Sequence, residues 1–233
     1  MVVRAVIFDF DGVICQTEVW KLGRTAEHLR KLGLIVETKQ LCLLAGGTFE
    51  EKEDIFDRIF GSQPRYWQIK EEAMHFHTGP FPFAKLVTPG LLPALKKLKE
   101  AGLALAVASN SRRERLREAL DQCGVLSFFD CTESAYDLGR KKPDPYVYTH
   151  TMEILGTKPE ETVVVEDSAL GIRAGKAAGA AVIALRDPEG AIDQREADAV
   201  ITGMEQLPDL VLAGRADEEN GAEGMKEANK IFT

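Results

Sequence analysis

The chain has 233 residues, a net charge of −8 and an isoelectric point near 5.2, with 45% apolar and 28% charged residues. This is the composition of a globular protein, and the acidic balance argues against a nucleic-acid-binding surface. No stretch approaches the roughly 20 consecutive apolar residues that a membrane span needs. Long-range repulsion would also act on an anionic substrate, so a site for one needs its own local positive charge.

The cysteines are widely spaced and form no C-x-x-C pair (Cys15, Cys42, Cys123 and Cys131). This pattern is typical of reduced thiols in a cytoplasm and argues against a disulfide framework or a zinc site. Met1–Arg4 leads into a strand-like segment without the features of a signal peptide. We therefore predict a cytoplasmic protein. We also expect it to be a monomer or weak dimer that contacts no membrane.

The first predicted element is a strand over Val2–Phe8, an apolar run of the kind that is buried on both faces of a parallel sheet. A long insertion of helical character and without strand patterns follows. Its three predicted helices are marked by Leu22, Ala26 and Leu29, by Ile55, Phe56, Ile59 and Phe60, and by Trp67–Met74. We predict that residues 17–87 form a small helical cap, joined to the core by linkers near Cys15–Thr17 and Val87–Gly90.

Strands and helices alternate after the insertion. Further strands are predicted at Leu103–Ala108, Thr162–Val165, Ala181–Leu185 and, as a weaker edge candidate, Ala199–Ile201. The intervening helices are marked by Leu91, Leu95 and Leu98, by Leu116, Leu120 and Cys123, and by the glycines Gly171, Gly175 and Gly179. Ser111–Glu114, before the second of these, has the S-x-x-E pattern of a capping box.

This alternation predicts an α/β fold, a doubly wound Rossmann-like parallel sheet that carries the inserted helical cap. The core would comprise residues 1–16 and 88–213. The remaining residues, 214–233, are acidic and contain several glycines. We expect them to form a loosely ordered tail.

Acidic residues follow two of the predicted strands. Asp9 and Asp11 come after the first strand and alternate along the chain, so they would point the same way from its carboxyl end, where doubly wound sheets bind ligands. Glu166 and Asp167 leave the strand Thr162–Val165 in the same manner. Taken alone, the first pair is equally compatible with an ordinary strand end and turn. Together, the four carboxylates could make an all-oxygen site of the type that suits Mg²⁺.

Two further segments could bind an anion. Ser109, Asn110 and Ser111 end a strand and precede a helix, where exposed N–H groups and a hydroxyl can cradle phosphate. Lys142 lies in the rigid turn Lys141–Pro145. By itself, each segment is also explained as an ordinary helix start or a surface lysine.

The order D-x-D-G, Ser/Asn, Lys-Pro, Glu-Asp resembles that of the haloacid dehalogenase-like hydrolase superfamily, over roughly residues 1–210. The resemblance implies that Asp9 attacks phosphorus and forms an aspartyl-phosphate. It also implies that Asp11 protonates the leaving oxygen and later deprotonates water. Ser109 and Lys142 would hold the phosphoryl oxygens.

The same resemblance implies a Mg²⁺ cofactor. Asp167, Asp9 and the backbone carbonyl of Asp11 would ligate the ion, and Glu166 would assist from close by. This agrees with elementary electrostatics, because a carboxylate can attack a phosphate only if positive charge offsets the repulsion.

The inserted cap resembles that of the phosphoglycolate phosphatase and β-phosphoglucomutase branch, in which a cap loop reads the substrate. Gly47 and Thr48 lie in the candidate loop Ala45–Phe49, which is also explained as an ordinary interhelical turn. We predict substrate contacts from these two residues and from Asn110, Ser111 and Arg112. The chain departs from the branch after D-G-V, where it has Gln16, Thr17 and Lys21.

The leading hypothesis is therefore a phosphatase of a small phosphorylated metabolite, such as a sugar phosphate. A phosphosugar mutase of the β-phosphoglucomutase type is the alternative. It would need a second phosphate site, for which the candidate cap loop offers Ala45 and Phe49, although Arg112 and Arg113 could partly compensate. A phospho-accepting signalling module is more distant, because a receiver domain needs no cap. Dehalogenation would require neither Asp11 nor the Mg²⁺ ligands.

Overall fold

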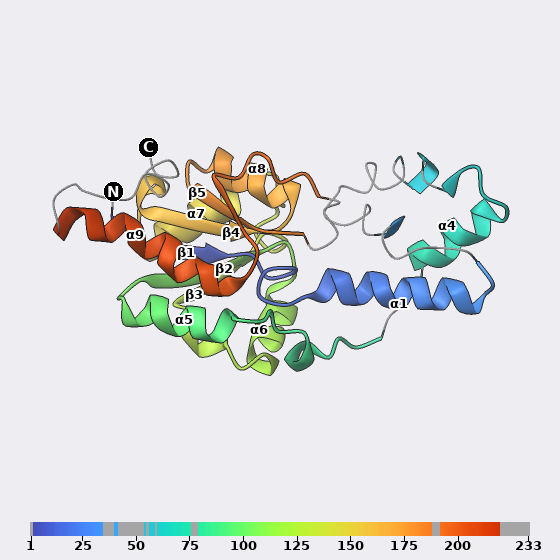
Figure 1. Cartoon of the computed structure of the whole chain (residues 1–233), viewed down its shortest axis with the longest axis horizontal. Coiled ribbons are helices and arrows are strands. Elements are labelled where there is room, and N and C mark those ends of the chain that lie inside the picture. Colours follow the sequence, from blue (N-terminus) through green and yellow to red (C-terminus); the bar gives the residue numbers. More distant parts are fainter. Residues whose placement is uncertain are drawn as a thin grey trace.

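The computed structural model describes residues 2–34, 40–41, 54, 56–58, 60–75, 79–187 and 192–219. Its core is one parallel sheet in the order β3-β2-β1-β4-β5-β6 (Figure 1). The strands are β1 Ala5–Phe8, β2 Ala104–Ser109, β3 Cys131–Ser134, β4 Thr162–Glu166, β5 Ala181–Leu185 and β6 Ala199–Ile201. The predicted doubly wound α/β fold is confirmed. Successive strands are added on one side of β1 up to β3 and on its other side from β4 onward, and such sheets bind ligands at the carboxyl ends of the strands at this switch point, between β1 and β4.

Helices cover both faces of the sheet. On one face lie α5 Leu91–Glu100, α6 Arg113–Gln122 and α9 Leu207–Glu219, and on the other lie α7 Tyr146–Leu155 and α8 Ala169–Ala177. The 3₁₀ turns are η1 Phe83–Lys85, η2 Leu126–Phe128, η3 Pro159–Glu161 and η4 Met204–Gln206. Strand β1 contributes to both layers, because Val6 and Phe8 face α5 and α6 while Ile7 faces α7.

Strand β3 is absent from the sequence prediction. Its residues Cys131–Ser134 form an edge strand with no large aliphatic side chain, so no apolar run marks it. Its buried Glu133 is instead paired with Arg113 of α6, with Nη2 and Oε2 3.0 Å apart. The ion pair offsets the cost of burying the Glu133 carboxylate. A strand with such polar buried side chains has no apolar pattern from which it could be predicted.

The cap lies at one end of the molecule (Figure 1). It contains α1 Thr17–Lys31 and α4 Tyr66–His75, whose facing side chains His28 and Glu72 are 2.8 Å apart. The small cap core consists of Ala26, Leu29, Leu34, Leu41, Phe56, Phe60 and Ile69. Ile55 and Ile59 lie outside the described residues. Trp67 is 75% exposed and so belongs to the rim of the cap.

The two linkers between core and cap pair with each other. The Gln16 N–H donates to the Leu86 carbonyl at 2.8 Å, and the Thr88 N–H donates to the Ile14 carbonyl at 3.0 Å. Phe83, which the sequence prediction assigns to the cap, packs in the core beside α6. This contact favours a second boundary between cap and core that lies before η1. The predicted cap bounds, residues 17 and 87, otherwise remain predictions.

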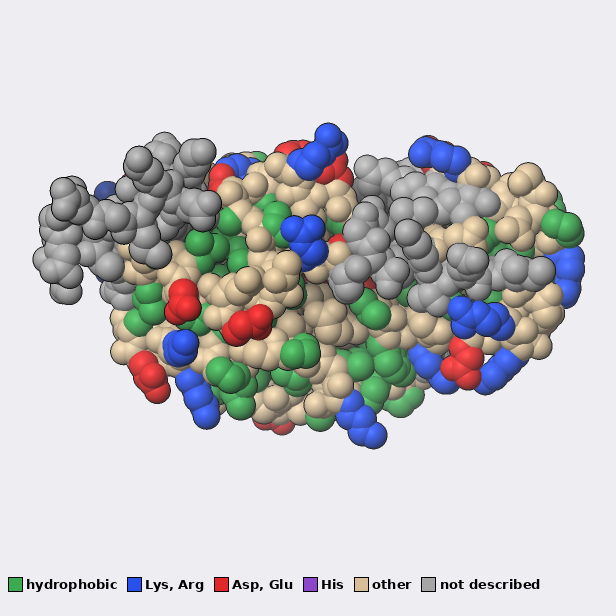
Figure 2. Space-filling view, in the orientation of Figure 1, with side chains coloured by type: hydrophobic (Ala, Val, Ile, Leu, Met, Phe, Trp, Pro, Cys, Tyr) green, Lys and Arg blue, Asp and Glu red, His purple; other side chains and the backbone are tan. Residues whose placement is uncertain are grey.

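Helix α9 continues to Glu219, so the first residues of the predicted tail are helical, and residues 220–233 lie outside the described part. None of the described helices is both long and apolar enough to cross a membrane. On the face shown in Figure 2, the described Lys and Arg side chains are scattered among acidic and uncharged ones.

Candidate active site

Strand β1 delivers Asp9 to the carboxyl edge of the sheet. The Asp9 N–H donates to the Val165 carbonyl at 2.9 Å, so the pairing of β1 with β4 extends to this residue. The side chain is nearly buried, since the residue is 8% exposed. Its Oδ1 accepts a hydrogen bond from Lys142 Nζ at 2.5 Å. Asp9 is therefore fixed by the sheet on its backbone side and by a cation on its carboxylate side.

Three of the predicted acids form a cluster. Asp9, Glu166 and Asp167 each place a carboxylate oxygen within 4.8 Å of the others. Glu166 is fully buried, and its oxygens accept from Lys142 Nζ at 2.7 Å, from the Tyr148 hydroxyl at 2.8 Å, and from the N–H groups of Asp167 and Ser168 at 3.0 and 3.2 Å. These bonds hold Glu166 in one orientation.

The cluster has more negative charge than its surroundings balance. Burial and the carboxylates of Glu166 and Asp11 raise the pKa of Asp9 to about 7, although Lys142 opposes them. Burial and its acidic neighbours also raise the pKa of Asp167 well above its ordinary value. Burial acts on Glu166 in the same direction, but the charge of Lys142 and the hydrogen bonds outweigh it and hold the pKa of Glu166 below its ordinary value. A buried cluster of carboxylate oxygens with unbalanced negative charge fits Mg²⁺, which prefers oxygen ligands.

Lys142 is the cation at the centre of the site. Its side chain is 3% exposed, and Nζ also donates to the Ala108 carbonyl at 2.9 Å. Its backbone N–H donates to Asn110 Oδ1 at 2.9 Å. Asn110, which we predict as a substrate contact, therefore holds the Lys142 turn in place. Burial of Lys142 is tolerated because both Asp9 and Glu166 pair with it.

The segment Ser109–Ser111 and the helix start that follows it differ in detail from the prediction. The predicted capping box at Ser111–Glu114 is wrong, because α6 begins at Arg113 after Arg112 with no cap from its own segment. Instead, Asp137 accepts from the Arg113 N–H at 3.1 Å. The Ser111 hydroxyl donates to Asp11 Oδ2 at 2.9 Å and accepts from Arg115 Nη1 at 2.5 Å, and it accepts from no backbone N–H of α6. The buried Ser109 Oγ accepts from the Ser111 N–H at 3.1 Å.

The two arginines that follow Ser111 point elsewhere. Arg112 Nη2 donates to the Tyr136 hydroxyl at 2.6 Å, and the guanidinium lies 4.4 Å from the centre of that ring. Arg113 donates to Glu133. The structure therefore gives both arginines protein partners at the β3 edge of the sheet, and a substrate contact from Arg112 remains a prediction.

The Asp11 carboxylate is not part of the acid cluster found among the described residues. Its Oδ1 accepts from the Thr17 hydroxyl at 2.5 Å, and Arg115 Nη2 lies 3.3 Å from the same oxygen. The sequence prediction includes neither contact. Thr17 appears there only as a linker residue, the first residue of the cap and a departure from the branch, and no motif contains Arg115. Tyr148 is a further omission, since nothing in the sequence marks it as the partner of Glu166.

Two glycines allow the segments of the site to approach each other. A Cβ on Gly12, whose φ is +91°, would lie 1.8 Å from Asp167 Oδ2. A Cβ on Gly171, in the first turn of α8, would lie 1.7 Å from Glu166 Oε1.

Gly175 of the same helix faces the sheet, where a Cβ would lie 2.8 Å from Val182 Cγ2. Gly179, which the sequence prediction assigns to this helix, lies beyond its end at Ala177, so that part of the prediction is wrong.

Gly171→Ala is expected to destabilise the protein by about 1–3 kcal/mol, because the added methyl overpacks the Glu166 site. Displacement of Glu166 would also loosen Lys142, so turnover should fall with stability. Thermal unfolding and phosphate release measure the two effects. Gly23→Ala in α1 is the matched control, since a Cβ there meets no atom within 4 Å and should stabilise by up to about 1 kcal/mol. Equal stability of Gly171→Ala and wild type would contradict the argument.

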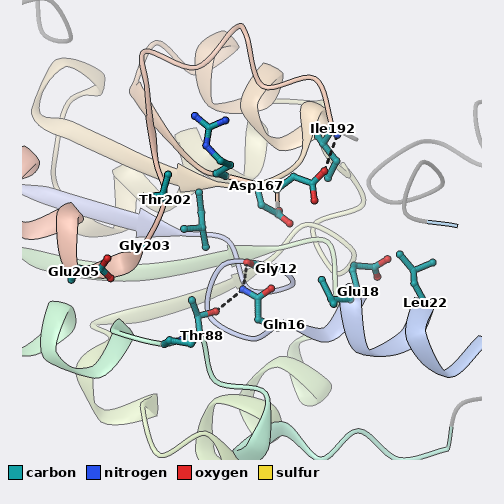
Figure 3. A pocket seen from close by; sticks show the side chains of 15 residues that line it. Gly12, Gln16, Glu18, Leu22, Thr88, Asp167, Ile192, Thr202, Gly203 and Glu205 are labelled. Carbon is teal, nitrogen blue, oxygen red and sulfur yellow. Dashed lines mark hydrogen bonds between the residues drawn. The ribbon is translucent and has the colours of Figure 1, made fainter. Parts of the chain in front are cut away.

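A cavity of about 410 Å³ borders this site. Gly12 and Asp167 belong to both, and further lining comes from the start of α1 and from the loops after β5 and β6 (Figure 3). The Gln16 amide donates to the Gly12 carbonyl and to Thr88 Oγ1, each at 2.9 Å. The predicted substrate contacts Gly47 and Thr48 lie outside the described residues.

Comparisons with known proteins agree with this geometry. The chain matches the haloacid dehalogenase-like hydrolase family over residues 3–179. A phosphoglycolate phosphatase of Aquifex aeolicus is 28% identical over 178 residues, which cover 76% of this chain and 81% of that protein. A phosphorylated carbohydrates phosphatase of Thermotoga maritima is 30% identical over 191 residues, which cover 76% and 82%.

Among solved structures, a HAD family hydrolase of Deinococcus radiodurans with bound phosphate and sodium has a TM-score of 0.72 and 28% identity, and the match covers 91% of this chain and 96% of that one. The predicted resemblance and the prediction of a phosphoric monoester hydrolase are confirmed. The chain belongs to the haloacid dehalogenase-like hydrolase family.

Proposed function

We propose that the chain is a Mg²⁺-dependent phosphatase that hydrolyses a small phosphorylated metabolite through an aspartyl-phosphate on Asp9. The observation that carries the proposal is the buried Lys142 ammonium, 2.5 Å from Asp9 and 2.7 Å from Glu166, within a cluster of three carboxylates. This arrangement places a carboxylate nucleophile beside a fixed cation. Such a pair suits attack on an anionic phosphoryl group.

In the proposed first step, an Asp9 oxygen forms a bond to phosphorus while the bond from phosphorus to the ester oxygen breaks. Asp11 gives its proton to that oxygen, and Ser109 and Lys142 hold the phosphoryl oxygens. In the second step, Asp11 takes a proton from water, which attacks phosphorus and releases Asp9 and inorganic phosphate. Division into two steps lowers each barrier.

Asp9, Asp167 and the Asp11 carbonyl are the proposed ligands of Mg²⁺, with Glu166 in support. The ion would offset the negative charge of the substrate and of Asp9. Glu166 would act mainly by orienting Lys142, because its oxygens already accept hydrogen bonds from protein groups.

The substrate class rests on the relatives and on the cavity. The relatives' names specify phosphoglycolate and phosphorylated carbohydrates. The cavity of about 410 Å³ has the volume of a small-molecule site and reaches the acid cluster at Asp167, although Asp9, Ser109 and Lys142 do not line it. We therefore propose short phosphorylated acids and sugar phosphates as substrates of a cytoplasmic enzyme.

Hydrolysis is preferred over phosphoryl shuttling within a sugar. A mutase needs a second cationic site for a bisphosphate, and Arg112 and Arg113 are engaged by Tyr136 and Glu133. A screen of phosphorylated acids and sugars should therefore release inorganic phosphate from at least one compound. β-Glucose 1-phosphate with catalytic glucose 1,6-bisphosphate should give little glucose 6-phosphate. Rapid formation of that product, with no phosphate release from any ester, would overturn the proposal in favour of a mutase.

A further inference from the structure

Arg115 contacts the carboxylate of Asp11, the predicted acid/base residue. Its Nη2 lies 3.3 Å from Asp11 Oδ1, and its Nη1 lies 3.5 Å from Oδ2. Nη1 also donates to the Ser111 hydroxyl at 2.5 Å, and that hydroxyl donates to Asp11. The guanidinium thus approaches both oxygens of one carboxylate, a geometry that fixes direction as well as charge.

Two aromatic rings hold the guanidinium in place. Its central carbon lies 5.3 Å from the centre of the Phe81 ring and 5.6 Å from that of Phe83. The two rings are stacked with centroids 5.5 Å apart, and Phe83 also contacts Phe10, the residue between the two motif aspartates. Arg115 is therefore held by the linker that returns from the cap, and its side chain is 35% exposed.

The other cations near the motifs are engaged elsewhere in the described part of the chain. Lys142 pairs with Asp9 and Glu166, Arg112 with Tyr136, and Arg113 with Glu133. Arg115 is the cation that the structure pairs with Asp11. The proposed catalytic steps do not involve this contact.

We propose that Arg115 is a positioning residue that holds the Asp11 carboxylate in the direction needed for proton transfer to the leaving group. The inference rests on the proposed phosphatase function and assigns Arg115 no contact with the phosphoryl group. Arg115 acts through Asp11, so its removal should impair only those reactions in which the leaving oxygen needs a proton.

Two probes of similar size separate such a role from a general structural one. The 4-nitrophenolate ion leaves without a proton, whereas the benzyl alkoxide leaving group of benzyl phosphate requires one. For Arg115→Met, kcat/KM for benzyl phosphate should fall roughly 100-fold, the scale of a displaced general acid. For 4-nitrophenyl phosphate, it should stay within about threefold of wild type. Since kcat/KM reports the steps up to phosphorylation, later dephosphorylation does not obscure the comparison.

Three further single variants and one double variant complete the test. Arg117→Met, an exposed arginine on the same helix, should leave both values unchanged. Asp11→Asn should show the same selective loss, and adding Arg115→Met to it should cause little further loss, because both changes remove one function. Arg115→Lys keeps the charge without the planar fork, so it should show the same selectivity with a smaller loss.

The outcomes separate this inference from the proposed function. If wild type with Mg²⁺ hydrolyses neither probe nor any ester in the screen, the phosphatase proposal fails, and this inference fails with it. If wild type is active and Arg115→Met loses both activities equally, or neither, Arg115 has no role through Asp11. Should Arg115→Met not fold, Arg115→Lys decides, and an equal effect on both probes overturns the inference.

Discussion

Asp9→Asn is expected to lower turnover by on the order of 10⁴-fold or more, the scale seen when a catalytic nucleophile is removed. A carboxamide oxygen is a poor nucleophile, and no other described carboxylate occupies the same place between Lys142 and Asp167. Glu166 is fixed by its hydrogen bonds, and Asp11 is turned toward Thr17 and Arg115. The loss should therefore appear in the rate of phosphate release with every substrate.

The same substitution should leave the fold intact and stabilise the metal-free protein. The asparagine has the shape of the aspartate, and its Oδ1 can still accept from Lys142. It also removes one of three mutually repelling carboxylates, the repulsion that helps to raise the pKa of Asp9 to about 7. Removal of a strained functional group commonly raises stability at the expense of activity.

Acid quenching during turnover of labelled substrate measures the covalent step directly. Wild type should retain label in an acyl phosphate that hydroxylamine cleaves, and Asp9→Asn should retain none. Asp121→Asn, the same chemical change at an exposed position of α6, is the control and should behave as wild type. Near wild-type turnover by Asp9→Asn would show that the covalent mechanism is wrong.

Most of the fold could be predicted because apolar runs mark buried strands. Five of the six strands begin and end within three residues of their predicted bounds, and two of these, Ala181–Leu185 and Ala199–Ile201, match at both ends. Strand β3 cannot be predicted from an apolar run, because its buried side chains are polar and its Glu133 pairs with Arg113 of α6. Helices α7 and α9 were also not predicted, although Val147 and Met152 do line the core.

Only those parts of the site that lie in the sequence motifs could be predicted. The positions of Asp9, Glu166, Asp167 and Lys142 follow from strand ends and one turn, and the structure brings these four side chains together. The direction of Asp11 could not be predicted in this way. It depends on Thr17 and Arg115, which lie on two helices, and on rings from the return linker. Contacts between segments so distant in sequence leave no local pattern.

Removal of divalent metal is expected to abolish phosphate release, and Mg²⁺ should restore it. In the metal-free site, three carboxylates face one ammonium group, so an anionic substrate meets net repulsion. Activity after exhaustive chelation, and again after Mg²⁺ is added, measures the dependence. Full activity in the chelated protein would exclude it.

Both the stability of the metal-free protein and its binding of Mg²⁺ should depend on pH, and the raised pKa of Asp9 gives the direction of each change. Its pKa rises from 3.8 to about 7 in the folded, metal-free protein. The folded state therefore holds a proton that the unfolded state releases, so metal-free stability should fall as pH rises from about 4 toward 7. The raised pKa of Asp167 acts in the same direction.

Mg²⁺ must displace that proton, so its affinity should weaken as pH falls below about 7. The increase in melting temperature at a fixed Mg²⁺ concentration should accordingly be larger at pH 7.5 than at pH 5.5. A metal present at about 100 times its Kd stabilises the folded state by about 2.7 kcal/mol, which is easily measured. Asp9→Asn should show a smaller shift that depends less on pH, because it lacks both the ligand charge and the competing proton. A shift that is the same at both pH values in wild type would mean that Asp9 does not bind the metal.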